Sequence, residues 1–310
     1  MKTVAFLWWE DEIDWSKDRP FGDKKWKNRD YAEYTEMLKE RDVKVLCGDY
    51  RWYTGGELEK AFHWDGEDWK KVEDVGLDGV YDLFRHSKQK YRLKKKMQEE
   101  VQVFNDPEVA ELCQDKLETY RNFSEHMPET LTASKQSTQK ILESASRAVL
   151  KPRYGSSGEG IEIVEKVPER IDEDMLVQEF MESDNLPEFG IEGPHDLRVL
   201  VVSGEPIGSY FRVPGEGLLS NVALGGNKIY VETDSLGQRI FEIVEEVDEK
   251  LESYNPSVYT VDFMYSDGRP WIVELNSQPG VYYHGEGREE EWERPWMERI
   301  ADAIAEKLQA

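Results

Sequence analysis

The chain has 310 residues, of which 65 are acidic and 40 are lysine or arginine, so its formal net charge is −25. A surface this negative repels phosphate backbones, which argues against a nucleic-acid partner. No apolar run is long enough to span a membrane, and the N-terminus turns acidic too early for a signal peptide. The two cysteines, Cys47 and Cys113, have no metal-ligand spacing. We therefore expect a cytoplasmic protein without membrane contacts, disulfide bonds or a zinc site.

Strand-like and helix-like segments alternate over the first hundred residues. The predicted elements are strands at 3–9, 43–47, 79–84 and 102–104 and helices at 31–40 and 88–100. Such alternation is typical of an open α/β sheet, so residues 1–104 are predicted to form an α/β domain. Residues 50–78 have many aromatic side chains and little periodicity, and we assign no regular element to them. The basic run from Lys88 to Lys96 is interpreted as the solvated face of a helix.

The middle of the chain places lysine and glycine in unusual positions. Asn105-Asp106-Pro107 is a strong helix start, and Asp115-Lys116 opens a further helix. Lys151 then ends a buried-looking strand, and a glycine–serine loop follows from Gly155 to Gly160. Backbone N–H groups of such a loop can approach phosphate oxygens, although the loop lacks the GKS or GKT of a P-loop. A tight, solvent-exposed turn is the alternative interpretation.

A late β-hairpin is predicted to carry charged residues inside its strands. Two apolar runs, 257–265 and 271–275, flank the sequence Ser-Asp-Gly-Arg-Pro. Glu274 and Asn276 share one face of the second strand. With a strict two-residue Asp-Gly turn Asp262 points to the other face, whereas one more loop residue or a bulge places it opposite Glu274. Carboxylates facing each other repel unless a cation lies between them, and oxygen ligands suit magnesium. The alternative is a hairpin whose polar residues face solvent.

The remaining elements lie between and around these motifs. Strands are predicted at 148–152, 161–164, 175–180, 199–202 and 207–213, and helices at 137–146, 238–254 and 293–308. Two segments are candidates for lining a substrate site, the aromatic residues 50–69 and the acidic loop 282–296. An acidic loop there favours a cationic amine or a basic peptide as substrate.

Taken in order, these motifs resemble those of the ATP-grasp enzymes, and most closely the glutathione-synthetase and ribosomal-protein glutamate-ligase (RimK-type) branch. The resemblance rests on Asn105-Asp106-Pro107, Asp115-Lys116, Leu150-Lys151-Pro152, Gly155 to Gly160, Gln178-Glu179-Phe180, Asp196-Leu197-Arg198, Asn221, Gly225-Gly226, Asp262 and Glu274-Leu275-Asn276-Ser277. It covers about residues 105–282 and implies two α+β subdomains clasping ATP, a central one at 105–180 with the flap and a C-terminal one at 181–310 with the metal site. Residues 1–104 resemble the family's Rossmann-like N-terminal domain in architecture only.

The resemblance also implies roles for individual residues. It implies nucleotide contacts by Lys116, Lys151, Gly155, Ser156, Ser157, Gly158, Gly160, Gln178, Glu179, Phe180, Asp196 and Asn221. Magnesium, with manganese as the alternative, is implied at Asp262, Glu274 and Asn276. Arg212 and Arg198 are implied to stabilise the transferred phosphoryl group. The family's arginine two residues before Asn221 is Leu219 here, so this loop departs from the pattern.

The implied activity is ATP-dependent ligation. ATP phosphorylates a carboxylate, and an amine on an amino acid, a small peptide or a protein tail then displaces phosphate to form an amide. Lysines, arginines and magnesium are suited to this reaction because they offset the charge of the triphosphate and of the acyl phosphate. A small-molecule kinase on the same fold and a non-catalytic nucleotide-binding protein are the alternatives. The sequence leaves open whether the protein is a homo-oligomer.

Overall fold

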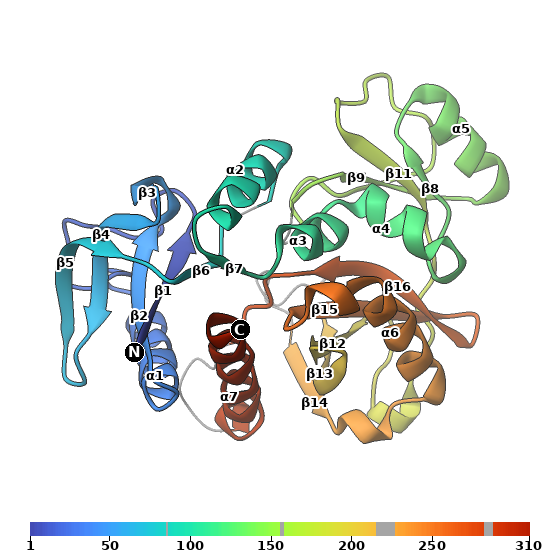
Figure 1. Cartoon of the computed structure of the whole chain (residues 1–310). Helices are drawn as coiled ribbons and strands as arrows, with labels where there is room; N and C mark the ends of the chain where they lie inside the picture. The colour runs from blue at the N-terminus through green and yellow to red at the C-terminus, as the bar shows by residue number, and fades with distance from the viewer. Residues whose placement is uncertain (85, 156–157, 215–226, 282–287) are drawn as a thin grey trace. The chain divides into compact units, whose positions relative to one another are not determined.

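The computed structural model describes residues 1–84, 86–155, 158–214, 227–281 and 288–310 (Figure 1). These residues divide into two compact units. The first contains Met1–Ala110, Leu251–Val258 and Gln278–Ala310, and the second contains Glu111–Lys250 and Tyr259–Ser277. No helix within these ranges combines the length and the apolar character that crossing a membrane requires.

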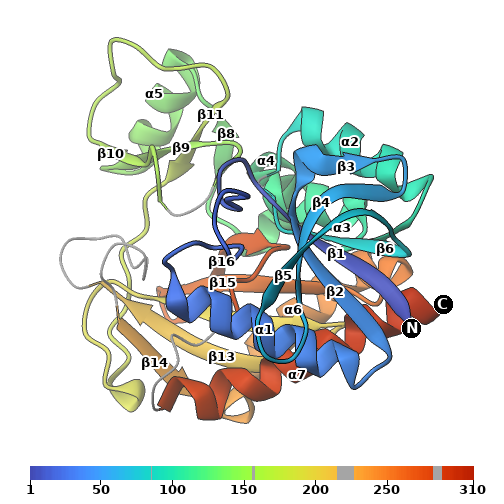
Figure 2. The same ribbon diagram turned by 90° about the vertical axis from the view of Figure 1, so that its left-hand side faces the viewer.

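The first unit is built on a seven-stranded sheet (Figure 2). Its strands are β1 (Lys2–Trp8), β2 (Val43–Asp49), β3 (Tyr53–Thr54), β4 (Glu57–Trp64), β5 (Trp69–Gly76), β6 (Gly79–Asp82) and β7 (Gln102–Phe104). The order is β3-β4-β2-β1-β6-β7, with β5 paired to β4. β1, β2, β6 and β7 pair in parallel, which confirms the predicted α/β arrangement. The antiparallel strands β3, β4 and β5 lie in the segment to which no element was assigned, so that part of the prediction is wrong.

Helices cover both faces of this sheet because successive residues of β1 are apolar, so that both of its faces are apolar. Ala5 and Leu7 belong to a buried cluster with Met97 of α2 (Lys88–Gln98). Phe6 points the other way, and its ring lies 6.2 Å from that of Tyr31 in α1 (Lys25–Lys39). A strand buried on both faces reads as a continuous apolar run, which explains the sequence at 3–9.

The last helix, α7 (Arg288–Gln309), packs in the first unit. Its buried residues include Leu308, whose side chain lies against Gly79. A Cβ atom at Gly79 would lie 2.9 Å from the Gln102 carbonyl oxygen, so this backbone contact favours glycine. Arg41 Nε, just after α1, donates to Asp302 Oδ1 at 2.6 Å. The sequence-based boundaries assigned residues 181–310 to one subdomain, whereas residues 278–310 group with the N-terminal residues.

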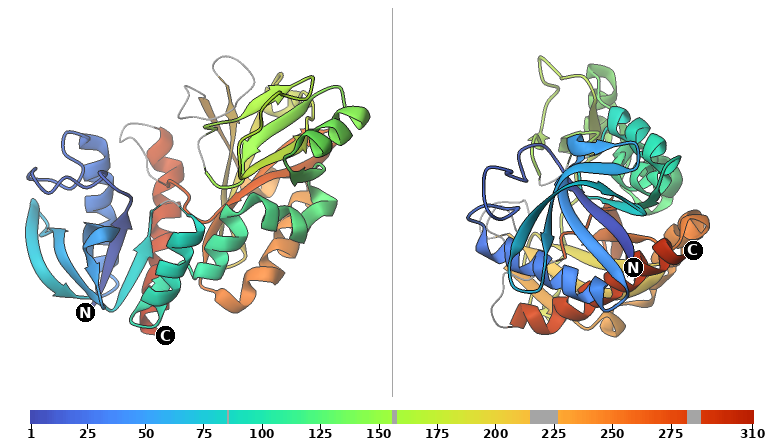
Figure 3. Two further views of the ribbon diagram at one scale, coloured as in Figure 1. Left: turned by 90° about the horizontal axis from the view of Figure 1, so that it is seen from above. Right: turned by 60° about the vertical axis from the view of Figure 1, so that its left-hand side comes forward.

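The second unit contains two sheets, of which the four-stranded one is antiparallel (Figure 3). The first sheet has the order β10-β9-β11-β8, formed by β8 (Thr130–Thr132), β9 (Ala148–Pro152), β10 (Glu162–Val164) and β11 (Met175–Glu179). The other has the order β14-β13-β12-β15-β16, formed by β12 (Asp196–Val202), β13 (Glu205–Val213), β14 (Asn227–Val231), β15 (Val258–Ser266) and β16 (Arg269–Asn276). The helices are α3 (Pro107–Gln114, across the boundary of the units), α4 (Lys116–Phe123), α5 (Lys135–Ser144) and α6 (Gln238–Leu251). This content confirms the predicted α+β character, while β8 and β14 were not predicted.

Candidate functional site

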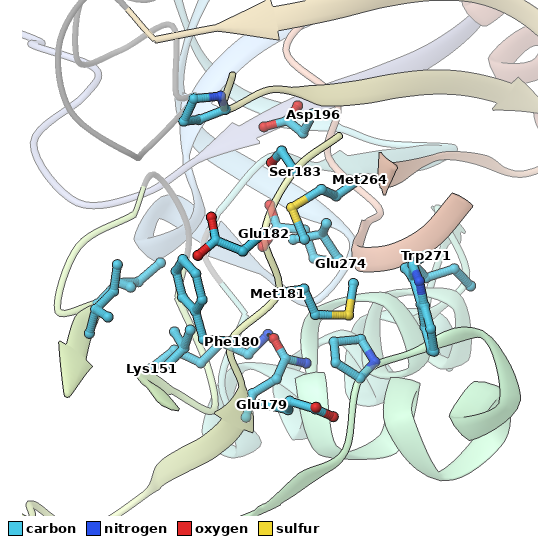
Figure 4. Close-up of a pocket in the computed structure, with 18 of the residues that line it drawn as sticks. Lys151, Glu179, Phe180, Met181, Glu182, Ser183, Asp196, Met264, Trp271 and Glu274 are labelled. Carbon is cyan, nitrogen blue, oxygen red and sulfur yellow. Dashed lines mark hydrogen bonds between the residues drawn. The ribbon is translucent and has the colours of Figure 1, made fainter. Parts of the chain in front are cut away.

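A cavity of about 350 Å³ lies in the second unit (Figure 4). Its apolar lining includes Val149, Ile161, Phe180, Met181, Met264, Trp271 and Ile272. Its polar lining includes Lys116, Lys151, Gln178, Glu179, Asp196 and Glu274. Apolar walls with a few polar groups are typical of a small-molecule site. Seven residues that the sequence nominated for nucleotide or metal binding therefore line one cavity.

Lys151 projects from β9 into a buried position and is held there by a chain of hydrogen bonds. The side chain is 5% exposed, and its Nζ donates to Gln178 Oε1 on the adjacent strand β11 at 2.9 Å. Gln178 Nε2 in turn donates to Thr130 Oγ1 of β8 at 2.7 Å, which fixes the orientation of the amide. Burial, together with the nearby charge of Lys116, lowers the pKa of Lys151 to about 8. An ammonium group has three donors, so the other two are available to an anionic ligand.

Asp115 ties the beginning of α4 to the end of β9. It is fully buried, caps α4, and accepts hydrogen bonds from Arg153 Nε at 2.7 Å and from the Tyr154 hydroxyl at 2.8 Å. Burial alone would raise the pKa of Asp115, but the hydrogen bonds from Arg153 and Tyr154 outweigh it and lower the pKa. Lys116, the first residue of α4, donates from Nζ to the carbonyl oxygen of Gly155 at 2.6 Å. The predicted phosphate-contacting lysine and the glycine loop therefore lie together.

The late hairpin places Asp262 directly opposite Glu274. The turn is a two-residue Asp267-Gly268 loop in which both residues have positive φ. A register shift between Asp262 and Phe263 inserts Val273 as an extra residue, and this bulge brings the two carboxylates to the same face. Of the two arrangements left open by the sequence, the bulged one is confirmed.

Two arginines bind Asp262 from neighbouring strands. Arg198 of β12 donates through Nε to Asp262 Oδ1 at 2.8 Å and through a terminal nitrogen to Oδ2 at 2.6 Å. Arg212 of β13 donates to Asp262 Oδ2 at 2.6 Å and to Asp196 Oδ1 at 2.5 Å. Burial of Asp262 would raise its pKa, but the two guanidinium groups outweigh burial and lower it. The network fixes both arginines, and the second terminal nitrogen of each forms no hydrogen bond with a described residue, so it can donate to an anion.

The oxygens around the hairpin fit magnesium. Asp262 Oδ1 accepts from Arg198 alone, so it keeps a lone pair, and Glu274 forms no ion pair within the part of the chain that the structure describes. Asn276 is two residues from Glu274 on the same strand, and its Oδ1 accepts from Gln114 at 2.9 Å. No three His, Cys, Asp or Glu side chains gather among the described residues. Carboxylate and amide oxygens are ligands that magnesium accepts, and it takes its other ligands from phosphate and water. The assignment of magnesium to Asp262, Glu274 and Asn276 stays a prediction.

Some of the other predicted site residues lie within the described ranges and some lie outside them. Gly155, Gly158 and Gly160 have φ values of 125°, 73° and 74°, which glycine adopts without strain. Ser156, Ser157 and Asn221 lie outside the described residues, as do Leu219 and residues 282–287 of the acidic loop. Phe180 lines the cavity, and the Arg147 guanidinium lies 4.0 Å from its ring centre. The roles given to all these residues stay predictions.

Sequence reasoning missed several residues that build the site. Thr130, Arg153 and Tyr154 act through partners 38 to 48 positions away, so no local periodicity reveals them. Trp271 and Met264 line the cavity, but in the sequence they are ordinary apolar strand residues. The available signal was Arg153 itself, a charged residue directly after a buried strand.

Comparisons with known proteins show which family the chain resembles. The family model described as an ATP-grasp domain matches residues 113–280, more than half of the chain. Glutathione synthetase of Synechocystis sp. is 31% identical over 192 residues, covering 58% of this chain and 56% of that protein. Tetrahydromethanopterin:alpha-L-glutamate ligase of Methanocaldococcus jannaschii is 27% identical over 219 residues, covering 67% of this chain and 70% of that protein. The chain spans about half the length of the first curated relatives it matches.

Solved structures resemble the chain over its whole length. D-alanyl-alanine synthetase A from Vibrio cholerae has a TM-score of 0.65 at 12% identity, covering 100% of this chain and 99% of that one. A RimK domain ATP-grasp protein from Sphaerobacter thermophilus has a TM-score of 0.60 at 15% identity, covering 99% of this chain and 100% of that one. At such identities the likeness concerns the fold alone, and it confirms the predicted fold.

Proposed function

Because the chain belongs to the ATP-grasp family, we propose that it is an ATP- and magnesium-dependent ligase that joins a carboxylate to an amine. The observation that carries the proposal is the common cavity of Lys116, Lys151 and Glu274. Two lysines and an open carboxylate beside apolar walls suit a nucleotide triphosphate with its metal. The relatives named as glutathione synthetase and glutamate ligases support the same reaction class.

In the proposed reaction the substrate carboxylate attacks the γ-phosphorus of ATP and the bond to ADP breaks. The amine then attacks the acyl phosphate, the C–N bond forms, phosphate leaves and the amine loses a proton. Lys151 and Lys116 hold the phosphates, and the free terminal nitrogens of Arg198 and Arg212 face the negative charge that develops. Glu274, Asn276 and Asp262 would hold magnesium, which would neutralise charge on the phosphates when bound.

The nucleotide base is proposed to lie among the apolar residues of the cavity. Phe180, Met181 and Trp271 offer the flat or adaptable surfaces that an adenine ring packs against. The N–H groups of Glu179 and Phe180 donate to the carbonyl oxygens of Glu129 and Arg147. The backbone that pairs with the adenine edge is therefore proposed to be that of residues 181–183, which follow β11 and line the cavity. The acceptor amine is proposed to belong to an amino acid, a peptide or a protein tail.

The proposal is tested by following ADP, free phosphate and amide product with purified protein, ATP, magnesium and a panel of carboxylates and amines. A ligase releases ADP and phosphate only when both substrates are present. A phosphorylated hydroxyl compound formed without amine and without free phosphate would favour the kinase alternative, and nucleotide binding without turnover would favour the non-catalytic one. Lys151→Met should slow turnover about a hundredfold or more, because a buried charge that contacts phosphate is lost. The control Lys250→Met removes an exposed lysine of α6 and should leave the rate unchanged.

A further inference from the structure

The helix α2, teal in Figures 1 and 2, concentrates positive charge in an otherwise acidic protein. Residues 85–96 contain seven of the chain's 40 lysines and arginines and no acidic residue. Three of its lysines have acidic partners in the first unit: Lys90 with Glu10 at 3.2 Å, Lys94 with Asp82, and Lys95 with Glu108 at 3.2 Å. The charge of the helix is therefore neutralised on one side only.

Lys88, Arg92 and Lys96 are the remaining cations of α2, and we call them the α2 stripe. All three are exposed, and none forms an ion pair with any residue that the structure describes. They recur every four residues, so they lie one above the other on one face of the helix. Like charges at this spacing repel one another and destabilise a helix. The stripe therefore has no ion-pair partner among the described residues of an acidic protein, and a bound anion would relieve its repulsion.

The spacing of the stripe matches an extended polypeptide. A helix rises 1.5 Å per residue, so successive members of the stripe are about 6 Å apart along the axis. Alternate side chains of an extended chain are about 6.6 Å apart and point the same way. We propose that the α2 stripe docks an extended acidic segment of a polypeptide, with carboxylates at three alternate positions. If the proposed function holds, that polypeptide is the peptide or protein to be ligated, and this acidic segment replaces the basic peptide that the sequence of the loop 282–296 favoured.

The surroundings of the stripe favour a peptide over a nucleic-acid strand. Exposed Glu99 and Glu100 directly follow the last residue of α2 and limit the stripe to three positive charges. Glu100 also accepts a hydrogen bond from the Tyr53 hydroxyl of β3 at 2.7 Å, which holds this acidic end in place. A phosphate backbone carries its charge onward past the stripe and would meet these carboxylates, and the net charge of −25 repels it further. A short acidic segment of a peptide, in contrast, carries its negative charges only along the stripe and avoids these carboxylates.

Binding is measured by fluorescence anisotropy at low salt with the full chain and no nucleotide. The probe is a labelled peptide containing Glu-Ser-Glu-Ser-Glu, and the comparison peptide of equal charge contains Glu-Glu-Glu-Ser-Ser. We expect the alternating peptide to bind more tightly. The triple variant K88E/R92E/K96E should weaken its binding about tenfold or more, because three exposed ion pairs are replaced by repulsion. Circular dichroism checks that the helix content of the variant is retained.

The matched control is K17E/R19E/K25E, which changes the net charge equally at three exposed cations of the same unit. It should leave binding within about threefold of the parent protein. The inference is overturned if the two peptides bind equally, if the control weakens binding as much as the stripe variant, or if neither peptide binds. It is also overturned if a single-stranded oligonucleotide binds the stripe more tightly, or if the stripe variant changes only self-association in sedimentation.

ATP turnover with small amines is a separate measurement, so a failure of the proposed function is recognised independently.

Discussion

Lys151 holds its proton weakly because its ammonium group is buried. Its pKa is lowered to about 8, below the 10.5 of an exposed lysine. Between about pH 8 and pH 10.5 the unfolded chain binds a proton at this position that the folded chain has lost. Stability rises with pH wherever the unfolded state binds more protons, so this lysine makes the ligand-free protein more stable as pH rises through that window.

ATP binding is expected to reverse this effect. A triphosphate beside Lys151 favours the charged form and raises its pKa again, so nucleotide binding near pH 8.5 should take up protons from solution. Calorimetric titrations in two buffers of different ionisation enthalpy measure this uptake. Lys151→Met should abolish it, whereas Lys250→Met should not. Proton release on binding would contradict the placement of the phosphates next to Lys151.

The two carboxylates of the hairpin should respond differently to neutralisation. Asp262 is 0% exposed and bound by two guanidinium groups, so Asp262→Asn leaves buried charge without its partner and should cost about 3 kcal/mol or more of unfolding free energy. Glu274 has no such partner among the described residues, so Glu274→Gln should cost less than about 1 kcal/mol. Both should reduce turnover. Chemical denaturation compares the two variants, and equal losses of stability would contradict the arginine network.

At the scale of elements, Asp115 connects α4 to β9. Asp115→Asn keeps a good helix cap but removes the charge that binds Arg153, whereas Asp115→Ala removes both. We expect both variants to raise the KM for ATP, because Lys116 is the first residue of α4 and loses its fixed position. Asp115→Ala should be about 1 kcal/mol less stable than Asp115→Asn, the usual value of a cap. Denaturant titration measures the difference, and identical stabilities would mean that the cap contributes nothing.

The sequence predicts elements better than it predicts their register. The hairpin was recognisable from its Asp-Gly turn, but the bulge at Val273 depends on pairing with another strand and has no local signal. β4 and β5 were missed because their exposed faces are charged and partly irregular, as in Trp69–Gly76, where exposed residues interrupt the alternation. The candidate site was found through residues whose polarity conflicts with a buried strand, such as Lys151. The residues that position them are brought in by tertiary contacts and cannot be read locally.

On the scale of the whole molecule, the net charge of −25 sets a dependence on salt. Excess carboxylates repel one another in the compact state, and this repulsion is screened within about 3 Å at 1 M salt but only within about 10 Å at 0.1 M. We expect the melting temperature to rise steadily as sodium chloride is raised from about 0.1 M to 1 M. Differential scanning fluorimetry measures it. A melting temperature that falls over this range would show that attractive ion pairs outweigh the general repulsion.

The packing of α7 in the first unit affects the order in which the two units can fold during synthesis. Leu308 of this helix is buried against Gly79 in the first unit, yet residues 111–250 and 259–277 of the other unit are translated before it. During synthesis the N-terminal sheet therefore lacks the contacts of α7 after all residues of the other unit have been translated. The other unit can fold first. The order in which the chain is synthesised is thus not the order in which its two halves are finished.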